Sequence, residues 1–545
     1  MSTFEDQLLE KGLITSARLQ QANSDARKSR SALADVLLRQ KLVQEEDVLQ
    51  VFAETQGIAY IELRERDIPN DVIARLSAKF AAHYQIVPVG FQGGSLTVAV
   101  CNALDMSVVE DIQTATGYSV ERVLACRDDV QEALRRYYGV GADTVERILA
   151  ESGATDADID VQEESHDLEL MAEDTSVVRL VNQLLHEAIA NRATDIHFEV
   201  YRDGLVLRRR VDGILFDTAV PQNIRLLYPS IVSRIKLMSG LNIVERRMPQ
   251  DGRARVTIGD AQFDLRVSIV PSIHGEDIVI RILPAAMIFD LPELGYGEAH
   301  VKELRTLIDV PHGIIFVTGP TGSGKSTTLY ACLSELNTRD RKIITIEDPV
   351  EYELRGITQT QINLKVGLTF AHALRSMLRH DPDVMLVGEV RDRETAEIAI
   401  QTAMTGHLVL SSLHTNDAAG GAARLIDMGI DPYLITSTVR AFIAQRLVRL
   451  ICAKCKEPYE RDGQTLYRGA GCRTCHQSGF RGRMAICEFL PLTPPVREMI
   501  LAKQSAKDIR ERADALGLRT MAADGWEKVA LGMTTAEEVL RVTSA

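Results

Sequence analysis

A glycine-rich segment of eight residues has the residue types and spacing of a loop that binds nucleotide phosphates. It is Gly319-Pro320-Thr321-Gly322-Ser323-Gly324-Lys325-Ser326, which matches the pattern G-x-x-x-x-G-K-[ST]. In such a loop the backbone N–H groups converge on the phosphates, the lysine neutralises the β and γ oxygens, and the hydroxyl is a ligand of Mg²⁺. We therefore expect ATP to contact Gly319, Pro320, Thr321, Gly322, Ser323, Gly324, Lys325, Ser326 and Thr327.

The segments on either side of this loop fit a strand and a helix. Residues 313–318 form an apolar run that is typical of a buried strand, and residues 326–336 contain few helix breakers. A strand, a glycine-rich loop and a helix in this order place the loop at a helix N-terminus, where the helix dipole favours anions. The arrangement predicts an α/β nucleotide-binding domain.

Two further predicted strands lead to carboxylates. Residues 342–346 precede Glu347, and residues 383–387 precede Glu389. Carboxylates that follow the strands of an open α/β sheet lie at the crevice where nucleotides bind. Gly388 stands where the acidic residue of a Walker B strand is usually found. Glu389 is therefore the better candidate for organising Mg²⁺ and the attacking water.

Histidines and arginines supply further candidates. His407 and His414 flank a third predicted strand, residues 408–411, and suit sensing of the γ-phosphate, although a single histidine is more often structural. Seven arginines crowd the strands predicted upstream, and phosphoryl transfer gains from an arginine supplied by another domain or subunit. A solvated strand face is the alternative interpretation for each of them: Arg208, Arg210, Arg246, Arg247, Arg253, Arg266 and Arg281.

Four cysteines form two pairs with the spacing of a zinc site. The pairs are Cys452-x-x-Cys455 and Cys472-x-x-Cys475, separated by sixteen residues, and four thiolates suit tetrahedral Zn²⁺. Disulfides are not expected in a reducing cytoplasm. The remaining cysteines are scattered and are expected in the core.

The composition indicates a soluble protein of several domains. The chain has 545 residues, of which 45% are hydrophobic and 25% charged. No apolar run approaches the roughly 20 residues that cross a bilayer, and the N-terminus lacks the order of a signal peptide. We therefore expect a cytoplasmic protein that reaches the membrane only through partners. The net charge of -14 argues against broad nucleic-acid binding.

The N-terminal part of the sequence changes pattern three times. Apolar residues recur 29 positions apart, as in Leu8 and Leu37, which predicts two similar helical units in residues 1–57. Short strands alternate with helices over residues 58–140, which predicts a small α/β domain. Ten acidic residues and no Lys or Arg between positions 151 and 174 predict a flexible acidic linker over residues 141–174.

The remaining segments have clear patterns as well. An amphipathic helix behind an N-cap at Thr175 or Ser176 opens a β-rich half-domain, residues 175–290. The ATPase core follows in residues 291–450, the cysteine segment in residues 451–490 and a set of small helices in residues 491–545.

Four of these motifs together resemble one family. The phosphate loop, Ile346-Glu347-Asp348-Pro349, the strand end at Gly388-Glu389 and the segment from Gly406-His407 to His414-Thr415-Asn416 look like its Walker A, Asp box, Walker B and His box. The family is that of the type II secretion ATPase E and the type IV pilus assembly ATPases, and the resemblance covers essentially the whole chain.

This resemblance implies a fold and a site. The fold is a RecA-like P-loop ATPase domain preceded by a β-rich half-domain and by helical and α+β N-terminal domains, with a zinc knuckle and a helical C-terminal end. A ring homohexamer holds ATP between the two half-domains. Glu347 matches the residue that positions or deprotonates the attacking water, and four arginines match positions near the phosphates: Arg266, Arg281, Arg375 and Arg379. The four-cysteine knuckle is typical of assembly ATPases and is missing from retraction ATPases.

The expected protein is therefore a cytoplasmic, peripheral inner-membrane ATPase with ATP, Mg²⁺ and Zn²⁺. It would drive pseudopilus assembly for type II secretion, docked on the inner-membrane platform and on the cytoplasmic domain of a bitopic membrane partner. A type IV pilus assembly ATPase is the alternative, and a nucleic-acid translocase is an alternative from another class. Some relatives bind cyclic di-GMP through an Arg-Leu-Gly motif, but this chain has Phe4-Glu5-Asp6 and Ala32-Leu33-Ala34 there. Cyclic di-GMP binding is therefore not expected.

Overall fold

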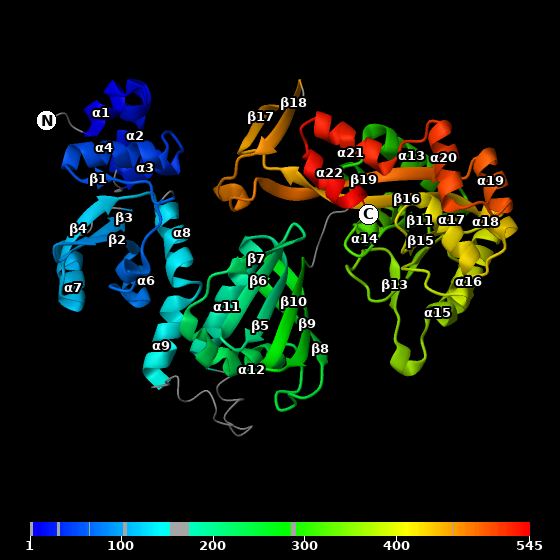
Figure 1. Cartoon of the computed structure of the whole chain (residues 1–545), viewed down its shortest axis with the longest axis horizontal. Helices are drawn as coiled ribbons and strands as arrows, with labels where there is room; N and C mark the ends of the chain where they lie inside the picture. The colour runs from blue at the N-terminus through cyan, green and yellow to red at the C-terminus, as the bar shows by residue number, and fades with distance from the viewer. Residues whose placement is uncertain are drawn as a thin grey trace. The chain divides into compact units, whose positions relative to one another are not determined.

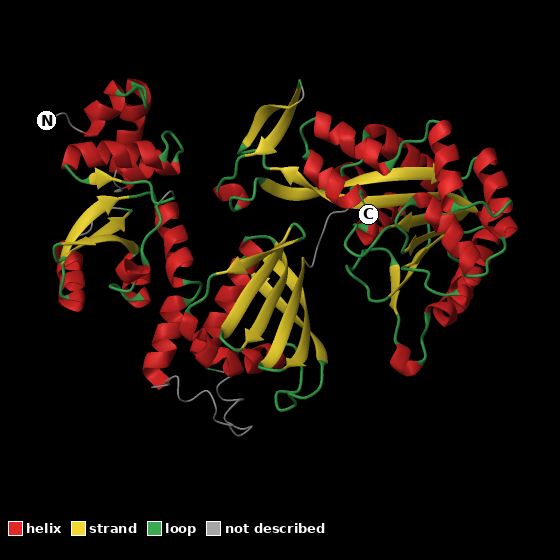
Figure 2. Ribbon diagram, in the orientation of Figure 1, coloured by secondary structure: helices red, strands yellow, loops and turns green. Residues whose placement is uncertain are grey.

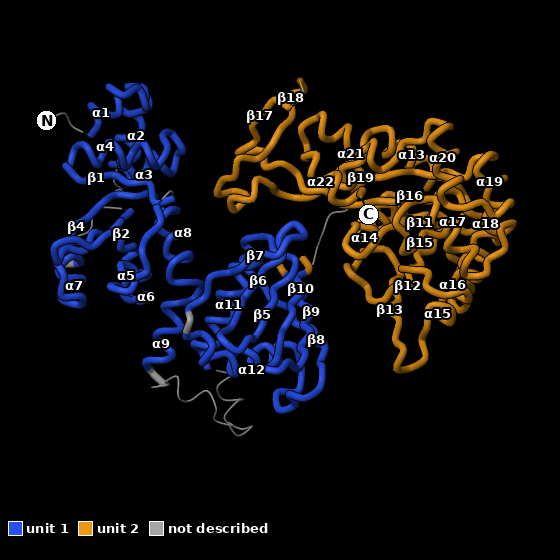
Figure 3. Tube along the Cα trace, in the orientation of Figure 1, with its two compact units in different colours: residues 1–259, 263–282 blue, residues 260–262, 283–545 orange. Residues whose placement is uncertain are grey.

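The computed structural model describes residues 4–29, 33–64, 66–101, 106–152, 174–284, 290–461 and 463–544. The chain divides into two compact units, residues 1–259 with 263–282 and residues 260–262 with 283–545 (Figure 3). Figure 1 labels their helices and strands. No helix of the described residues is long and apolar enough to cross a membrane.

Four helices form the N-terminal end of the first unit. Pairs of residues at the predicted repeat spacing are buried together: Leu8 with Leu37, and Ala22 with Val51, are all 0% exposed. Two helix pairs thus share one core. The helices are α1 (Phe4–Glu10), α2 (Ser16–Ser29), α3 (Leu33–Arg39) and α4 (Glu45–Gln56).

A four-stranded sheet follows, with the strand order β1-β4-β3-β2. Its apolar positions and the helices around it form two buried clusters. The strands are β1 (Ala59–Tyr60), β2 (Ile86–Gln92), β3 (Ser95–Val100) and β4 (Ser119–Leu124), and the helices are α5 (Asn70–Ile73), α6 (Ala78–Tyr84), α7 (Met106–Thr116) and α8 (Arg127–Tyr138).

The first residues of the expected linker form a helix, α9 (Ala142–Ser152). Val145 and Ile148 of α9 are buried in the core of the β-rich half-domain, so burial of apolar side chains orders this segment. On the other side, the carboxylate of Glu146 accepts hydrogen bonds from the backbone N–H groups of Ala78 (3.0 Å) and Lys79 (2.9 Å) at the start of α6. The linker prediction is therefore wrong for residues 142–152, and residues 153–173 lie outside the described residues.

A six-stranded antiparallel sheet, in the order β7-β6-β5-β10-β9-β8, packs against α11 and α12 (Figure 2). The N-cap of α11 is Asp174 and not the predicted Thr175 or Ser176, because Oδ1 of Asp174 accepts from the N–H groups of Ser176 and Val177. The elements are α11 (Thr175–Ala190), β5 (Ala193–Tyr201), β6 (Gly204–Val211), β7 (Ile214–Thr218), η2 (Gln222–Leu227), α12 (Tyr228–Met238), β8 (Gln250–Ile258), β9 (Ala261–Ser272) and β10 (Gly275–Pro284).

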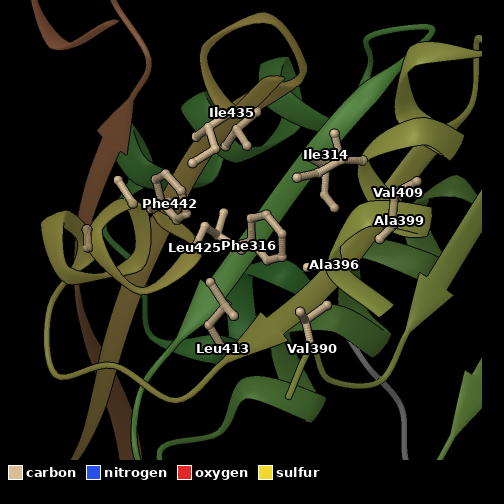
Figure 4. Close-up of a cluster of buried hydrophobic side chains, with 14 of the residues drawn as sticks. Ile314, Phe316, Val390, Ala396, Ala399, Val409, Leu413, Leu425, Ile435 and Phe442 are labelled. Carbon is tan, nitrogen blue, oxygen red and sulfur yellow. The ribbon is translucent and has the colours of Figure 1, made fainter. Parts of the chain in front are cut away.

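The second unit is built on a seven-stranded sheet in the order β13-β12-β14-β15-β11-β16-β19. All its neighbours run parallel except β19, which is antiparallel to β16. Every residue of β11 is buried. The rings of Phe316 on β11 and Phe442 on β16 stack with centroids 5.6 Å apart within one core (Figure 4), and a second core includes Ile315 and Val317.

The strands of this sheet are β11 (Gly313–Thr318), β12 (Ile343–Glu347), β13 (Thr358–Gln361), β14 (Val384–Val387), β15 (Leu408–Leu413), β16 (Val439–Ile451) and β19 (Phe480–Pro491). The helices among them are η3 (Leu291–Leu294), α13 (Glu298–Ile308), α14 (Lys325–Leu336), η4 (Leu364–Val366), α15 (Phe370–Met377), η5 (Leu378–His380), α16 (Arg393–Met404), α17 (Ala418–Asp427) and α18 (Pro432–Thr438).

A small hairpin and a set of helices complete the second unit. The hairpin, β17 (Lys456–Arg461) and β18 (Gln464–Gly469), lies between the two cysteine pairs. In the second pair, Cys472 is the N-cap of η6 (Arg473–Cys475) and Cys475 is its last residue. The four helices predicted at the C-terminal end are present as α19 (Pro494–Leu501), α20 (Ala506–Ala515), α21 (Met521–Ala530) and α22 (Ala536–Thr543).

Candidate active site

The phosphate loop connects β11 to α14, as the sequence predicts. Lys325 begins α14, and its ammonium donates to the carbonyl oxygens of Gly319 (2.8 Å) and Pro320 (3.1 Å). Gly319 allows the loop to lie close to the sheet, because a Cβ there would lie 2.8 Å from the backbone oxygen of Gln445. Burial lowers the pKa of Lys325 to about 8, against the opposing effect of Glu389 and with the further lowering effect of Arg446.

The residues of this loop fit a nucleoside triphosphate with Mg²⁺. The hydroxyl oxygen of Ser323 is buried without a hydrogen-bond partner among the described residues, and Ser326 is exposed in the first turn of α14. A lysine bonded to two loop carbonyls can transfer its hydrogen bonds to phosphate oxygens without a change in the fold.

Glu389 lies at the same edge of the sheet as the loop. Val387 pairs with Ser411, and Leu413 pairs with Thr318 directly before the loop. The carboxylate of Glu389 is 12% exposed, forms an ion pair with Arg391 and lies 3.2 Å from Nε2 of His414. A side chain at Gly388 would place its Cβ 3.2 Å from the carbonyl oxygen of Ile346, so a larger residue there would require a small shift of the neighbouring strand.

Glu347 is more enclosed than Glu389. It ends β12 with 4% exposure, and its carboxylate accepts hydrogen bonds from Tyr330, from Thr345 (2.6 Å) and from Gln359 (3.2 Å). Burial raises the pKa of Glu347 against the lowering effect of these donors. The surroundings therefore hold this carboxylate in one orientation.

The two candidate histidines lie at opposite ends of β15. His414 follows the strand at the edge that carries the loop, whereas the carbonyl of His407 accepts from the N–H of Gly313 at the start of β11. Six residues of strand separate the two edges by roughly 20 Å. Nδ1 of His407 contacts the carbonyl of Thr402 (3.0 Å) and the hydroxyl of Thr405 (3.1 Å). The expectation that His407 reaches the γ-phosphate is corrected, because the length of the strand separates it from the loop.

The four arginines implied by the resemblance fall into two pairs. Arg375 on α15 donates to Glu394 of α16 (2.7 Å), and Arg379 donates to the carbonyl of Arg375 (3.1 Å). In the other unit, Arg266 and Arg281 line a cavity of about 370 Å³.

That cavity also contains Arg253 and Asp195. Arg281 donates to Asp195 at 3.0 Å, so one carboxylate orients at least one of the three guanidinium groups. Three arginines on one concave surface of the β-rich half-domain suit an anionic group such as a phosphate.

Two buried polar residues on β16 were not predicted from the sequence as part of the site. Gln445 and Arg446 are 1% and 8% exposed. Arg446 donates to the backbone oxygen of Asn416 (3.0 Å), and burial lowers its pKa. The sequence does mark these two residues, because they form a polar pair inside the apolar segment 441–448. Polar groups in a buried apolar strand are retained only where they have hydrogen-bond partners.

The four predicted metal ligands converge. The Sγ atoms of Cys452 and Cys472 are 3.7 Å apart and those of Cys455 and Cys475 are 3.8 Å apart, and all four lie within 4.8 Å of one another. A tetrahedron with Zn–S bonds of about 2.3 Å has edges of about 3.8 Å. The cluster therefore fits Zn²⁺ bound by four thiolates.

A second cluster, His300, Cys487 and Asp524, is fully buried. Here the ammonium of Lys528 already lies 2.7 Å from Oδ2 of Asp524 and balances its charge. The cysteine knuckle is therefore the metal site that the charges of the described residues favour.

Comparison with known proteins identifies the family. The model of the Type II/IV secretion system protein family matches residues 171–541, and that of the MshEN domain matches residues 56–144. The chain is 40% identical to the type II secretion system protein E of Xanthomonas campestris, over 98% of this chain and 97% of that protein. It is 39% identical to the type IV pilus assembly ATPase PilB of Myxococcus xanthus, over 98% of both chains.

A solved structure gives the same fold. The ATPase DotB of Legionella pneumophila aligns with a TM-score of 0.52 at 24% identity, over 67% of this chain and 95% of that one. The second unit is thus RecA-like, as the sequence predicts. Because the family model matches residues 171–541, which include the phosphate loop, the chain belongs to the type II/IV secretion system ATPases.

Proposed function

We propose that this protein hydrolyses ATP to power protein export through a type II secretion system. The observation that carries ATP hydrolysis is the meeting of Lys325, Glu389 and His414 at one edge of the sheet: β11, β14 and β15 run parallel and in register, and Glu389 influences the ionisation of Lys325. The similarity to a type II secretion system protein E supports the link to protein export.

The roles of the residues follow from their surroundings. Lys325 and the loop N–H groups bind the β and γ phosphates. Ser326 and Glu389 would hold Mg²⁺, which when bound neutralises charge that develops on the phosphates. His414 orients Glu389 through the 3.2 Å contact. Glu347, fixed by three donors, positions the attacking water or accepts its proton.

Arginines complete the site in a ring of six copies. Arg266 and Arg281 belong to the β-rich half-domain, and Arg375 and Arg379 to the unit that carries the phosphate loop. In a homohexamer, these cations stabilise the charge of the transition state. Gel filtration with light scattering and ATP present tests the assembly, since a persistent monomer with full activity would contradict it.

Assembly of a type IV pilus is the second candidate, because a pilus assembly ATPase is as similar to this chain, at 39% identity, as a type II secretion protein, at 40%. Complementation separates the two. We expect the gene to restore export in a strain that lacks its type II secretion ATPase and not twitching in a strain that lacks its pilus assembly ATPase. The reverse result would assign the protein to pilus assembly.

The same proposal includes a location and partners. We place the protein in the cytoplasm, at the inner membrane only through its platform and the cytoplasmic domain of a bitopic partner, with residues 1–57 as the docking module. Cyclic di-GMP should not bind residues 1–140, and a binding titration tests this. ATPase activity that requires added DNA would favour a nucleic-acid translocase instead.

A further inference from the structure

We infer that Gln445 is a positioning residue of the phosphate loop, which it holds from inside the sheet through its side-chain amide. This inference rests on the proposed function, since the loop is taken to bind ATP. Gln445 lies on β16, the neighbour of β11 on the side away from β15. Thr318, the last residue before the loop, pairs with Ala444, so Gln445 stands directly beside the point where the loop begins.

Both the nitrogen and the oxygen of the amide form hydrogen bonds, one to the loop and two to residues that support it. Nε2 donates to the carbonyl oxygen of Ser323 at 2.7 Å, while Oε1 accepts from the hydroxyls of Tyr296 at 2.6 Å and Thr328 at 2.8 Å. Gln445, Tyr296 and Thr328 are 1%, 6% and 1% exposed. Water therefore does not compete for these bonds, and an unmade bond here is costly.

The orientation of the amide follows from the partners themselves. A backbone carbonyl only accepts hydrogen bonds, so the NH₂ group of Gln445 must face Ser323. The carbonyl of the amide then faces the two hydroxyls, and both of them must donate. The carbonyl of Ser323 thus selects one amide orientation, and the two hydroxyls adapt to it by donating.

This orientation bears directly on phosphate binding. The C=O and N–H groups of one trans peptide point in opposite directions. Because the carbonyl of Ser323 faces Gln445, the N–H of Gly324 points away from Gln445, as a donor to a bound phosphate requires. Two glycines of the loop lie close to Gln445. A Cβ at Gly319 would be 2.8 Å from the backbone oxygen of Gln445, and a Cβ at Gly324 would be 3.0 Å from its Nε2.

The test compares ATP binding to full-length variants. Gln445→Met keeps the length and the apolar stem of the side chain but removes all three hydrogen bonds. Its affinity for ATP with Mg²⁺, measured by calorimetry, should fall roughly tenfold, as expected for the loss of a buried hydrogen-bond network. Inhibition by adenosine, which has no phosphates, should not change. Gln504→Met, an exposed glutamine of the same unit, is the matched control and should bind as the unmodified protein does.

A milder variant keeps the test decisive if Gln445→Met does not fold. Tyr296→Phe preserves the ring that packs on Phe489 and removes one of the two hydroxyls, so ATP affinity should fall roughly threefold. Unchanged ATP affinity in both folded variants, or an equal loss for ATP and adenosine, would overturn the inference. ATP binding without hydrolysis by the unmodified chain would instead overturn the proposed function and leave this comparison intact.

Discussion

Nε2 of His414 lies 3.2 Å from Oε2 of Glu389, so the residue after β15 contacts the carboxylate that follows β14. The two side chains form a pair at the edge of the sheet that carries the phosphate loop. The contact limits the orientations that the carboxylate of Glu389 can adopt beside the loop.

Substitutions of Lys325 and Glu389 should separate binding from hydrolysis. Lys325→Ala removes the charge that neutralises the phosphates and should lose ATP binding, whereas Glu389→Gln should retain binding and lose roughly 10²- to 10⁴-fold in turnover. Equilibrium binding of ATP and steady-state hydrolysis measure the two effects. An equal loss of nucleotide affinity in both variants would contradict the division.

The low pKa of Lys325, about 8, predicts that ATP affinity depends on pH. As the pH rises through about 8, the free protein loses the charge on Lys325, while bound phosphates favour the charged form. ATP affinity should therefore decrease up to tenfold per pH unit above this value, with uptake of a proton on binding. Calorimetry in buffers of different ionisation enthalpy measures this uptake. Lys325→Arg should bind ATP with little pH dependence, because arginine stays protonated.

Glu347→Gln should destabilise the protein as well as inactivate it. Tyr330 and Thr345 donate to different oxygens of the carboxylate. Glutamine has an NH₂ group in place of one of them, so one of these two hydrogen bonds loses its acceptor, which costs about 1–3 kcal/mol. The melting temperature should fall by roughly 3–10 °C. Glu389→Gln is the control, and a similar melting temperature for the two variants would contradict the enclosed environment of Glu347.

The cysteine knuckle should contain about one Zn²⁺ per chain. Elemental analysis of protein purified without chelators measures the metal, and Cys472→Ser should lower both the zinc content and the melting temperature. Cys101→Ser, outside the cluster, should change neither. Full zinc content in the Cys472→Ser variant would place the metal elsewhere.

Two truncations should behave differently because of α9. A protein that begins at Val140 keeps Val145 and Ile148 in the core of the β-rich half-domain and should retain ATPase activity but lose recruitment to membranes. A protein that begins at Glu151 exposes that core and loses about 1.5–3 kcal/mol for each of the two side chains. Melting temperature, hydrolysis and membrane fractionation distinguish them. Truncated protein that still sediments with membranes in the presence of the secretion machinery would exclude docking by the deleted residues.

Local patterns predicted much of the fold and part of the site. Strand β11 has the predicted bounds, because its apolar run is short and bounded by turns. The four cysteines meet because a single antiparallel hairpin, β17–β18, connects the two pairs and brings them together. Sequence alone could not tell that His407 lies at the far edge of the sheet, since this depends on strand direction and register. Gln445 was missed because its partners are 122 and 149 residues away in the chain.

Helix α9 precedes residues 153–173 in the chain but belongs, through Val145 and Ile148, to the core that follows them. The packing of α9, and not the continuous backbone through residues 153–173, therefore keeps the N-terminal residues attached to the β-rich half-domain. A protease that cuts once within residues 153–173 should yield two fragments that migrate as one particle under native conditions and separate only in denaturant, because the attachment is a packed helix rather than the chain itself.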